Sequence, residues 1–153
     1  MAETDLAPEL LRLVRSPDNP CFVCGQHNPG GLHVEFHRSG DLIYAEWTPD
    51  ERHQGWQGVV HGGILASLLD EAMAYTLFTQ GTMAMTARME VRYRSPGRAG
   101  DLLRVEARCV KDTRKIADID GRISTSGRTI AEASARFVKV GDFDPDAVFR
   151  SVQ

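Results

Sequence analysis

The chain has 153 residues, enough for one domain built around a single hydrophobic core. Apolar residues make up 42% and charged residues 25%, a balance that excludes a disordered chain. The formal net charge of −3 gives no reason to expect nucleic acid as a partner. The longest apolar-leaning stretch, 55–69, is too short and too polar to cross a bilayer, so no membrane partner is expected.

Residues 1–19 are expected to form a helical extension ahead of the main domain. Leucines recur at helical spacing over residues 5–15. The first residues lack the basic start and apolar stretch of a signal peptide, which predicts a cytoplasmic protein. Residues 16–31 are rich in Pro, Gly and Asn and are expected to form a loop.

The next segments show strand and helix periods in turn. Alternating apolar and polar residues predict strands over 32–37 and 43–48, joined by a tight turn at 39–41. A helical period then runs from His61 to Gln80. Alternation returns in four further predicted strands, over 87–94, 103–109, 117–123 and 131–137.

These elements predict an α+β fold. Each expected strand has one polar and one apolar face, as in an antiparallel sheet that is covered on one side. Only the helix of residues 61–80 is large and apolar enough to cover that face. We therefore expect one antiparallel sheet to wrap around this helix in a domain of residues 20–140, with a peripheral tail over 141–153.

One face of the predicted helix lacks the long charged side chains of a solvated surface. It carries mostly small residues, namely Ala66, Ser67, Asp70, Ala74 and Leu77. Small residues allow another backbone to approach closely. We infer that this face meets a second subunit, giving a homodimer or a dimer of dimers in which Asp70 is partly enclosed.

The helix begins with His61, Gly62 and Gly63. The first N–H groups of a helix lack internal partners and lie at the positive end of its dipole. The two glycines either open the turn into the helix or leave room for a carbonyl oxygen that gains negative charge. Asp70 lies about 13–14 Å farther along the axis than His61, so one carbonyl could reach both only across two subunits.

Two runs resemble a known family. The run GVVHGGILASLLDEAM, from Gly58 to Met73, resembles the signature of hotdog thioesterases of the phenylacetate-pathway (PaaI) type, in which an Asp follows nine residues after the His. The run CFVCGQHNPGGL, from Cys21 to Leu32, resembles the N-terminal loop of one bacterial branch of that family. The resemblance covers about residues 20–140 and implies a dimerising hotdog fold.

The resemblance also implies catalytic roles. Asp70 would act as general base on water or as nucleophile toward the thioester carbonyl. The Gly62 N–H would polarise that carbonyl, and His61 would position the thioester. Thr86, on the strand after the helix, matches the position at which a Ser or Thr orients the attacking water.

A second group of residues is expected on the substrate side of the site. Members of the family often carry an Asn in the loop before the His, and Gly55 stands at that spacing here. Gln54 or Gln57 could take its place. Gly63 and Glu71 complete the expected substrate-binding set, and Glu71 could also be the base, although it lies at the edge of the apolar stripe.

The spacing of Cys21 and Cys24, with His27 and His33 nearby, could suggest zinc. A structural zinc site needs four ligands, and a second clear pair is missing. We therefore expect no metal and no cofactor.

The predicted function is hydrolysis of a medium-chain or aromatic acyl-CoA to free acid and coenzyme A. Residues 76–153 carry 14 basic and 10 acidic residues, an excess that either suits polyanionic coenzyme A or lines the solvent face of the sheet. Two alternatives remain, a non-catalytic acyl-CoA-binding protein of the same fold and a hotdog enoyl-CoA hydratase or dehydratase. Those hydratases space their His and acid differently.

Overall fold

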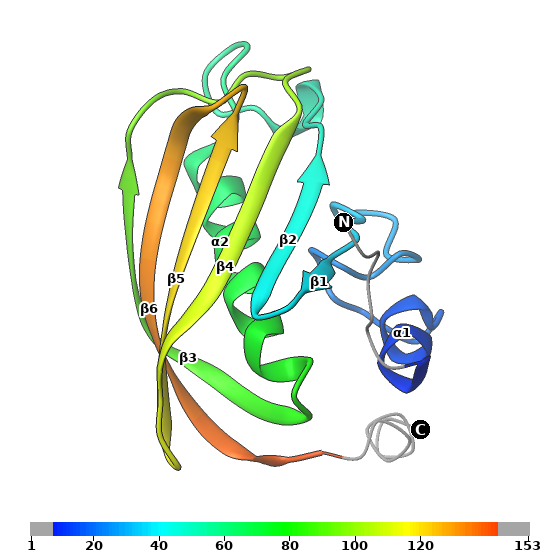
Figure 1. The fold of residues 1–153 in the computed structure, drawn as a ribbon. Helices are drawn as coiled ribbons and strands as arrows, with labels where there is room; N and C mark the ends of the chain where they lie inside the picture. The colour runs from blue at the N-terminus through cyan, green and yellow to red at the C-terminus, as the bar shows by residue number, and fades with distance from the viewer. Residues whose placement is uncertain (1–7, 144–153) are drawn as a thin grey trace.

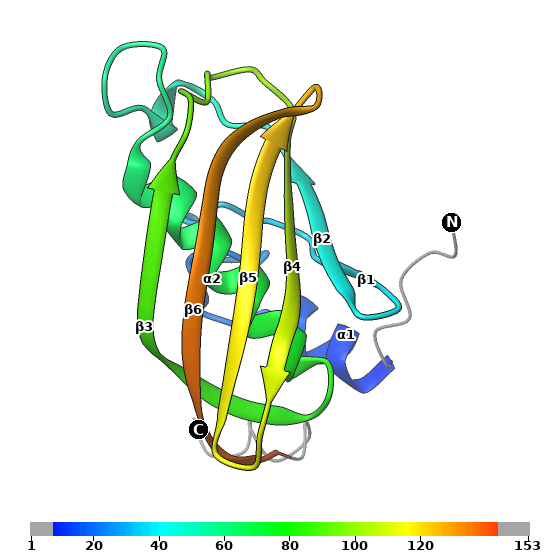
Figure 2. The same ribbon diagram turned by 60° about the vertical axis from the view of Figure 1, so that its left-hand side comes forward.

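The computed structural model describes residues 8–143, in which a curved antiparallel sheet wraps around the long helix α2 (Figure 1). In chain order the elements are α1 (Pro8–Arg15), β1 (His37–Ser39), β2 (Leu42–Trp47), the 3-10 helix η1 (Glu51–His53), α2 (Gly62–Phe78), β3 (Thr82–Tyr93), β4 (Leu103–Asp112), β5 (Ile116–Thr125) and β6 (Arg128–Asp142). The sheet has the order β1-β2-β4-β5-β6-β3, so β1 and β3 form its two edges (Figure 2). This arrangement confirms the predicted α+β hotdog fold.

The core lies between α2 and the concave face of the sheet. Leu68 and Leu69 of the predicted apolar stripe are fully buried, and so is Met73. Gly121 in β5 lets the helix come close, because an added Cβ would lie only 3.1 Å from the Leu69 side chain. Leu77 was expected on the face that meets a second subunit, and this expectation is wrong. Its side chain is 1% exposed, because α2 is covered on more than one side.

The strand expected over residues 32–37 is also wrong in its bounds, since only His37 belongs to β1. Leu32 and Val34 are buried as the alternation predicts. Their N–H groups donate to the carbonyl oxygens of Phe22 and Val23 in the preceding loop, at 2.8 Å each, and not to a neighbouring strand. The alternation therefore indicated correctly which side chains are buried, but not which backbone groups pair.

The N-terminal segment packs near the C-terminal half of α2 (Figure 1). Val14 and Val23 from this segment belong to the same buried cluster as Tyr75 and Leu77 of α2. The expected helix start at residue 5 and the tail after residue 143 lie outside the described residues. Within residues 8–143, no helix combines the length and apolar character needed to cross a membrane.

Candidate active site

Asp70 and Thr86 form a direct contact between α2 and the edge strand β3. Thr86 Oγ1 donates a hydrogen bond of 2.7 Å to Asp70 Oδ1. Asp70 is half-buried, whereas Thr86 is exposed. Asp70 Oδ2 makes no hydrogen bond within residues 8–143, so it can accept one from a water or a substrate. The fold thus brings together two of the expected catalytic residues.

A β-bulge in β3 explains how Thr86 comes to face α2. Thr86 pairs with Phe137 and Arg88 with Arg136, so Ala87 is an extra residue on this strand. A bulge changes which face the following side chains occupy. Simple alternation through this stretch would have placed Thr86 on the outer face of the sheet.

The start of α2 leaves one backbone donor without a partner. His61 is the N-cap, and its Nδ1 accepts a hydrogen bond of 2.9 Å from the Gly63 N–H. In the neutral imidazole the proton therefore resides on Nε2. The Gly62 N–H makes no hydrogen bond within the described part of the chain, and it lies at the positive end of the helix dipole. This geometry suits a carbonyl oxygen as ligand.

The loop before α2 is held by a capping box in η1. The Asp50 side chain accepts from the Arg52 N–H at 2.8 Å, and the His53 ring accepts from the Asp50 N–H at 3.0 Å. Hydrogen bonds from Arg52 lower the pKa of Asp50 to about 2. The carbonyl of His53 then accepts from the His61 N–H at 2.9 Å. These hydrogen bonds connect the loop to the first turn of α2.

A hollow of about 490 Å³ lies beside this helix start. Its lining comes from the loop and the first turn of α2, namely Gln54, Gly55, Trp56, Val59, Val60, His61 and Gly62. The Gln54 side chain accepts from the Gly58 N–H and donates to the Glu51 carbonyl, so it also holds the loop together. Gln57 is exposed and does not line the hollow. The structure thus brings Gln54 to the helix start and leaves Gln57 apart.

Glu71 lies apart from the Asp70–Thr86 pair, because successive helix residues point about 100° away from each other. A hydrogen bond of 3.2 Å joins its carboxyl group to Cys21 Sγ. Burial, assisted by the charge of Cys21, raises the pKa of Glu71 to about 8. Hydrogen bonds from Cys24 lower the pKa of Cys21 to about 5. The structure places Glu71 against the N-terminal loop.

Tyr93, at the end of β3, contacts the helix start, and this contact was not predicted from the sequence. Its hydroxyl donates a hydrogen bond of 2.8 Å to the Gly62 carbonyl, and its ring lies 3.4 Å from the position of an added Gly62 Cβ. Tyr93 alternates in phase with Met89 and Val91, which pack against the core. That phase was a usable signal for a side chain on the α2 side of the sheet.

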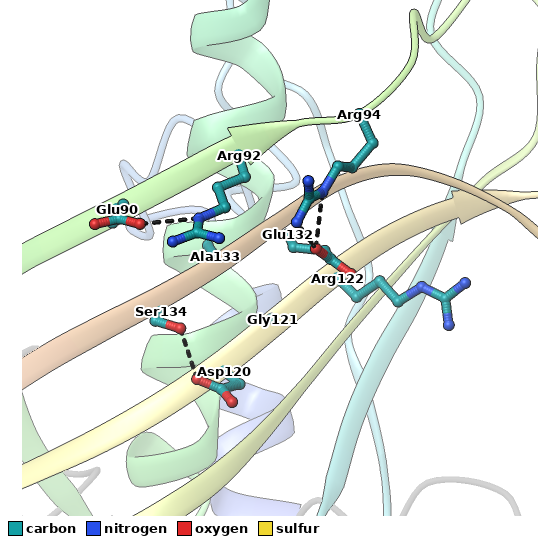
Figure 3. Close-up of a pocket in the computed structure, with 9 residues that line it drawn as sticks. All are labelled: Glu90, Arg92, Arg94, Asp120, Gly121, Arg122, Glu132, Ala133 and Ser134. Carbon is teal, nitrogen blue, oxygen red and sulfur yellow. Dashed lines mark hydrogen bonds and ion pairs between the residues drawn. The ribbon is translucent and has the colours of Figure 1, made fainter.

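A second hollow, of about 420 Å³, lies on the outer face of the sheet, with α2 behind the strands (Figure 3). Arg92 pairs there with Glu90 at 3.0 Å, and Arg94 pairs with Glu132 at 3.1 Å. Arg122 projects from the same face (Figure 3). These arginines lie on the opposite side of the sheet from Asp70 of α2. For them, the structure agrees with the second explanation of the basic excess, in which basic residues line the solvent face of the sheet.

Comparison with known proteins defines the class. Residues 57–141 match the family model of the thioesterase superfamily, and the chain belongs to this family. Acyl-coenzyme A thioesterase 13 of Mus musculus is 29% identical over 96 residues, which cover 60% of this chain and 69% of the mouse protein.

Solved structures share the fold. The Escherichia coli PaaI protein, from the phenylacetic acid degradation operon, superposes with a TM-score of 0.69 at 24% identity, covering 72% of this chain and 82% of that protein. A hypothetical thioesterase of Streptococcus pneumoniae, solved with coenzyme A, has a TM-score of 0.69 at 21% identity, covering 72% and 88%. The prediction of a thioester hydrolase of the thioesterase superfamily is confirmed.

Proposed function

We propose that this protein hydrolyses medium-chain or aromatic acyl-CoA thioesters to the free acid and coenzyme A. The observation that carries the proposal is the contact between Thr86 and Asp70, which orients a half-buried carboxylate and leaves its second oxygen without a partner. A relative named acyl-coenzyme A thioesterase and a structural neighbour solved with coenzyme A support acyl-CoA as the substrate class.

In the proposed reaction, Asp70 accepts a proton from a water molecule as that water attacks the thioester carbonyl. A carbon–oxygen bond forms, and the Gly62 N–H donates to the carbonyl oxygen as it becomes negative. The carbon–sulfur bond then breaks, and the thiolate of coenzyme A leaves and takes up the proton. His61 positions the thioester through its Nε2–H. Alternatively, Asp70 attacks the carbonyl directly and expels the thiolate of coenzyme A, and water then cleaves the resulting anhydride.

A second subunit is part of the proposal. The β3 strand is a 12-residue sheet edge, and edges of this kind readily pair with another chain. Met85 and Tyr93 on this strand are 63% and 53% exposed, large values for apolar and aromatic side chains. Pairing of two β3 strands would place the helix start of one subunit near Asp70 of the other.

The direct test is a screen of acyl-CoA thioesters with DTNB, which detects the released thiol. We expect hydrolysis, and we expect Asp70→Asn to lower kcat by at least about 100-fold, because it removes the base or nucleophile while keeping its shape. Glu90→Gln, on the outer face of the sheet, is the matched control and should retain wild-type turnover.

Two results would contradict this proposal. Unchanged turnover in Asp70→Asn would remove Asp70 from the mechanism. Tight binding of acyl-CoA thioesters without release of thiol across the whole panel would instead favour a non-catalytic binding protein. Hydration of crotonyl-CoA, measured in parallel by loss of its enoyl absorbance, would identify a hydratase.

A further inference from the structure

Three side chains of metal-binding types lie together where the N-terminal loop meets α2. Cys21, Cys24 and Glu71 each place one ligand atom within 4.8 Å of the others, and Cys21 Sγ is 3.2 Å from Glu71 Oε1. In a tetrahedral zinc site with Zn–S bonds of about 2.3 Å, neighbouring ligand atoms lie about 3.5–3.8 Å apart. Small side-chain shifts would therefore bring these three atoms into zinc-binding positions.

The backbone around the two cysteines forms a tight turn that directs both sulfurs toward α2. The Gly25 N–H donates to the Cys21 carbonyl at 2.9 Å. Gly25 is required for this turn, because an added Cβ would lie 2.5 Å from that same carbonyl oxygen. The turn thereby fixes the spacing of two potential ligands before any ion binds.

Each sulfur also receives an N–H hydrogen bond. The Cys24 N–H lies 3.4 Å from Cys21 Sγ, and the Asn19 side-chain amide lies 3.6 Å from Cys24 Sγ. Asn19 is itself held in place, since its amide also donates to the Val14 carbonyl at 2.9 Å. Such donors orient the two sulfurs from outside the site.

An independent observation comes from Tyr75. Its side chain is 3% exposed, and its hydroxyl has no hydrogen-bond partner within the described residues. Tyr75 and all three candidate ligands line one apolar pocket of about 340 Å³. A buried hydroxyl without a partner is costly, and a metal-bound water in this pocket would supply the partner.

We propose that Cys21, Cys24 and Glu71 bind a zinc ion, with a water molecule as the fourth ligand in the pocket beside Tyr75. Zinc accepts thiolate and carboxylate ligands together, and three protein ligands leave one position open. The ion would fasten the N-terminal loop to α2 at the residue after Asp70. The third ligand lies in a different element from the two cysteines, and only the fold brings it to them.

The first experiment measures zinc content in the full-length protein, purified without a metal-affinity tag, by plasma mass spectrometry. We expect close to one zinc per chain. Cobalt should replace zinc after chelation and give the thiolate-to-cobalt charge-transfer absorption of a tetrahedral site. A folded wild-type chain without bound zinc and without this absorption would overturn the proposal, whatever the thioesterase assay shows.

Ligand variants locate the site. Cys21→Ser and Glu71→Gln should each weaken zinc binding by more than about 100-fold, measured by competition with a chromophoric chelator. Cys109→Ser is the matched control and should bind zinc as the wild type does, because Cys109 lies on β4, outside the cluster. If Cys109→Ser loses as much affinity as Cys21→Ser, the assignment of the ligands is wrong.

Tyr75→Phe tests whether the Tyr75 hydroxyl forms a hydrogen bond with a metal-bound water. In the chelated protein this change removes an unpartnered buried group, so the Tm should rise. In the zinc-loaded protein it removes a hydrogen bond to the metal-bound water, so zinc affinity should fall by about 10-fold. A rise in Tm of the same size in both forms would contradict the proposed water ligand.

Discussion

The hydroxyl of Thr86 restrains a carboxylate that would otherwise turn freely on the helix surface. Hydrogen bonds to a charged acceptor contribute about 1.5–3 kcal/mol, enough to select one orientation of the Asp70 side chain. Reactivity depends on that orientation, because a displacement of about 1 Å at a reacting group can cost about 100-fold in rate. In the proposed mechanism, Thr86 therefore acts on the reaction through Asp70.

This role predicts the outcome of a matched pair of variants at residue 86. Thr86→Val keeps the shape and removes the donor, so kcat should fall by about 10–100-fold with little change in KM. Thr86→Ser keeps the hydroxyl and should stay within a few-fold of wild type. Steady-state kinetics on the best thioester from the screen provide the measurement. A wild-type kcat in Thr86→Val would show that the contact has no catalytic role.

Individual residues differed in how well the sequence predicted their surroundings. Asp70, Gly62 and His61 share one helix, so spacing along that helix sufficed to place them. Thr86 was named by resemblance, and its contact with Asp70 depends on a bulge that alternation does not reveal. Glu71 was expected on the substrate side, but its neighbours Cys21 and Cys24 are about 50 residues away in sequence.

At the scale of the element, the start of α2 is both capped and open to a ligand. The His61 side chain caps the helix by accepting a hydrogen bond from the Gly63 N–H, and it leaves the Gly62 N–H free to donate to a ligand. The backbone of His61, with φ −59° and ψ 132°, is extended, a conformation that also suits the residue before a proline. Proline is tolerated at the first helical position, where it removes only an N–H that has no partner.

Gly62→Pro therefore removes the N–H group that is proposed to donate to the carbonyl oxygen, with little disturbance of the helix. We expect kcat/KM to fall by about 100–1,000-fold, the usual loss when one such donor is removed. Gly62→Ala keeps the N–H and is the control, and its Cβ would meet Tyr93 at 3.4 Å, a contact that is close but tolerable. Circular dichroism should show native helix content in both variants. Equal losses in both would mean that crowding, and not the N–H, limits the rate.

Sequence patterns predicted the elements that bury one face over a long stretch. The apolar stripe of α2 and the alternating strands β4, β5 and β6 were all recognisable from their periods. The segment over 32–36 was not, because its alternating side chains are buried while its backbone pairs with a loop. Side-chain periodicity indicates which side chains are buried, but it does not indicate which carbonyl group each backbone N–H group pairs with.

At the scale of the whole molecule, the proposed mechanism requires two subunits to form one complete site. Gly62 and Asp70 lie on the same helix, eight residues and about 12 Å apart along its axis. A single carbonyl group cannot contact both. The exposed edge β3 carries Thr86 next to Asp70 and carries Tyr93 next to Gly62, so pairing along this edge would bring opposite ends of two helices together.

Subunit complementation tests this arrangement. Asp70→Asn and Gly62→Pro chains, each inactive alone, are mixed, unfolded and refolded together. Random pairing makes half of the dimers mixed, and each mixed dimer regains one of its two sites, so activity should return to about a quarter of wild type. The mixed dimer can be isolated with two different tags and its turnover measured by DTNB. If it is pure and still inactive, Asp70 and Gly62 do not act across the subunit boundary.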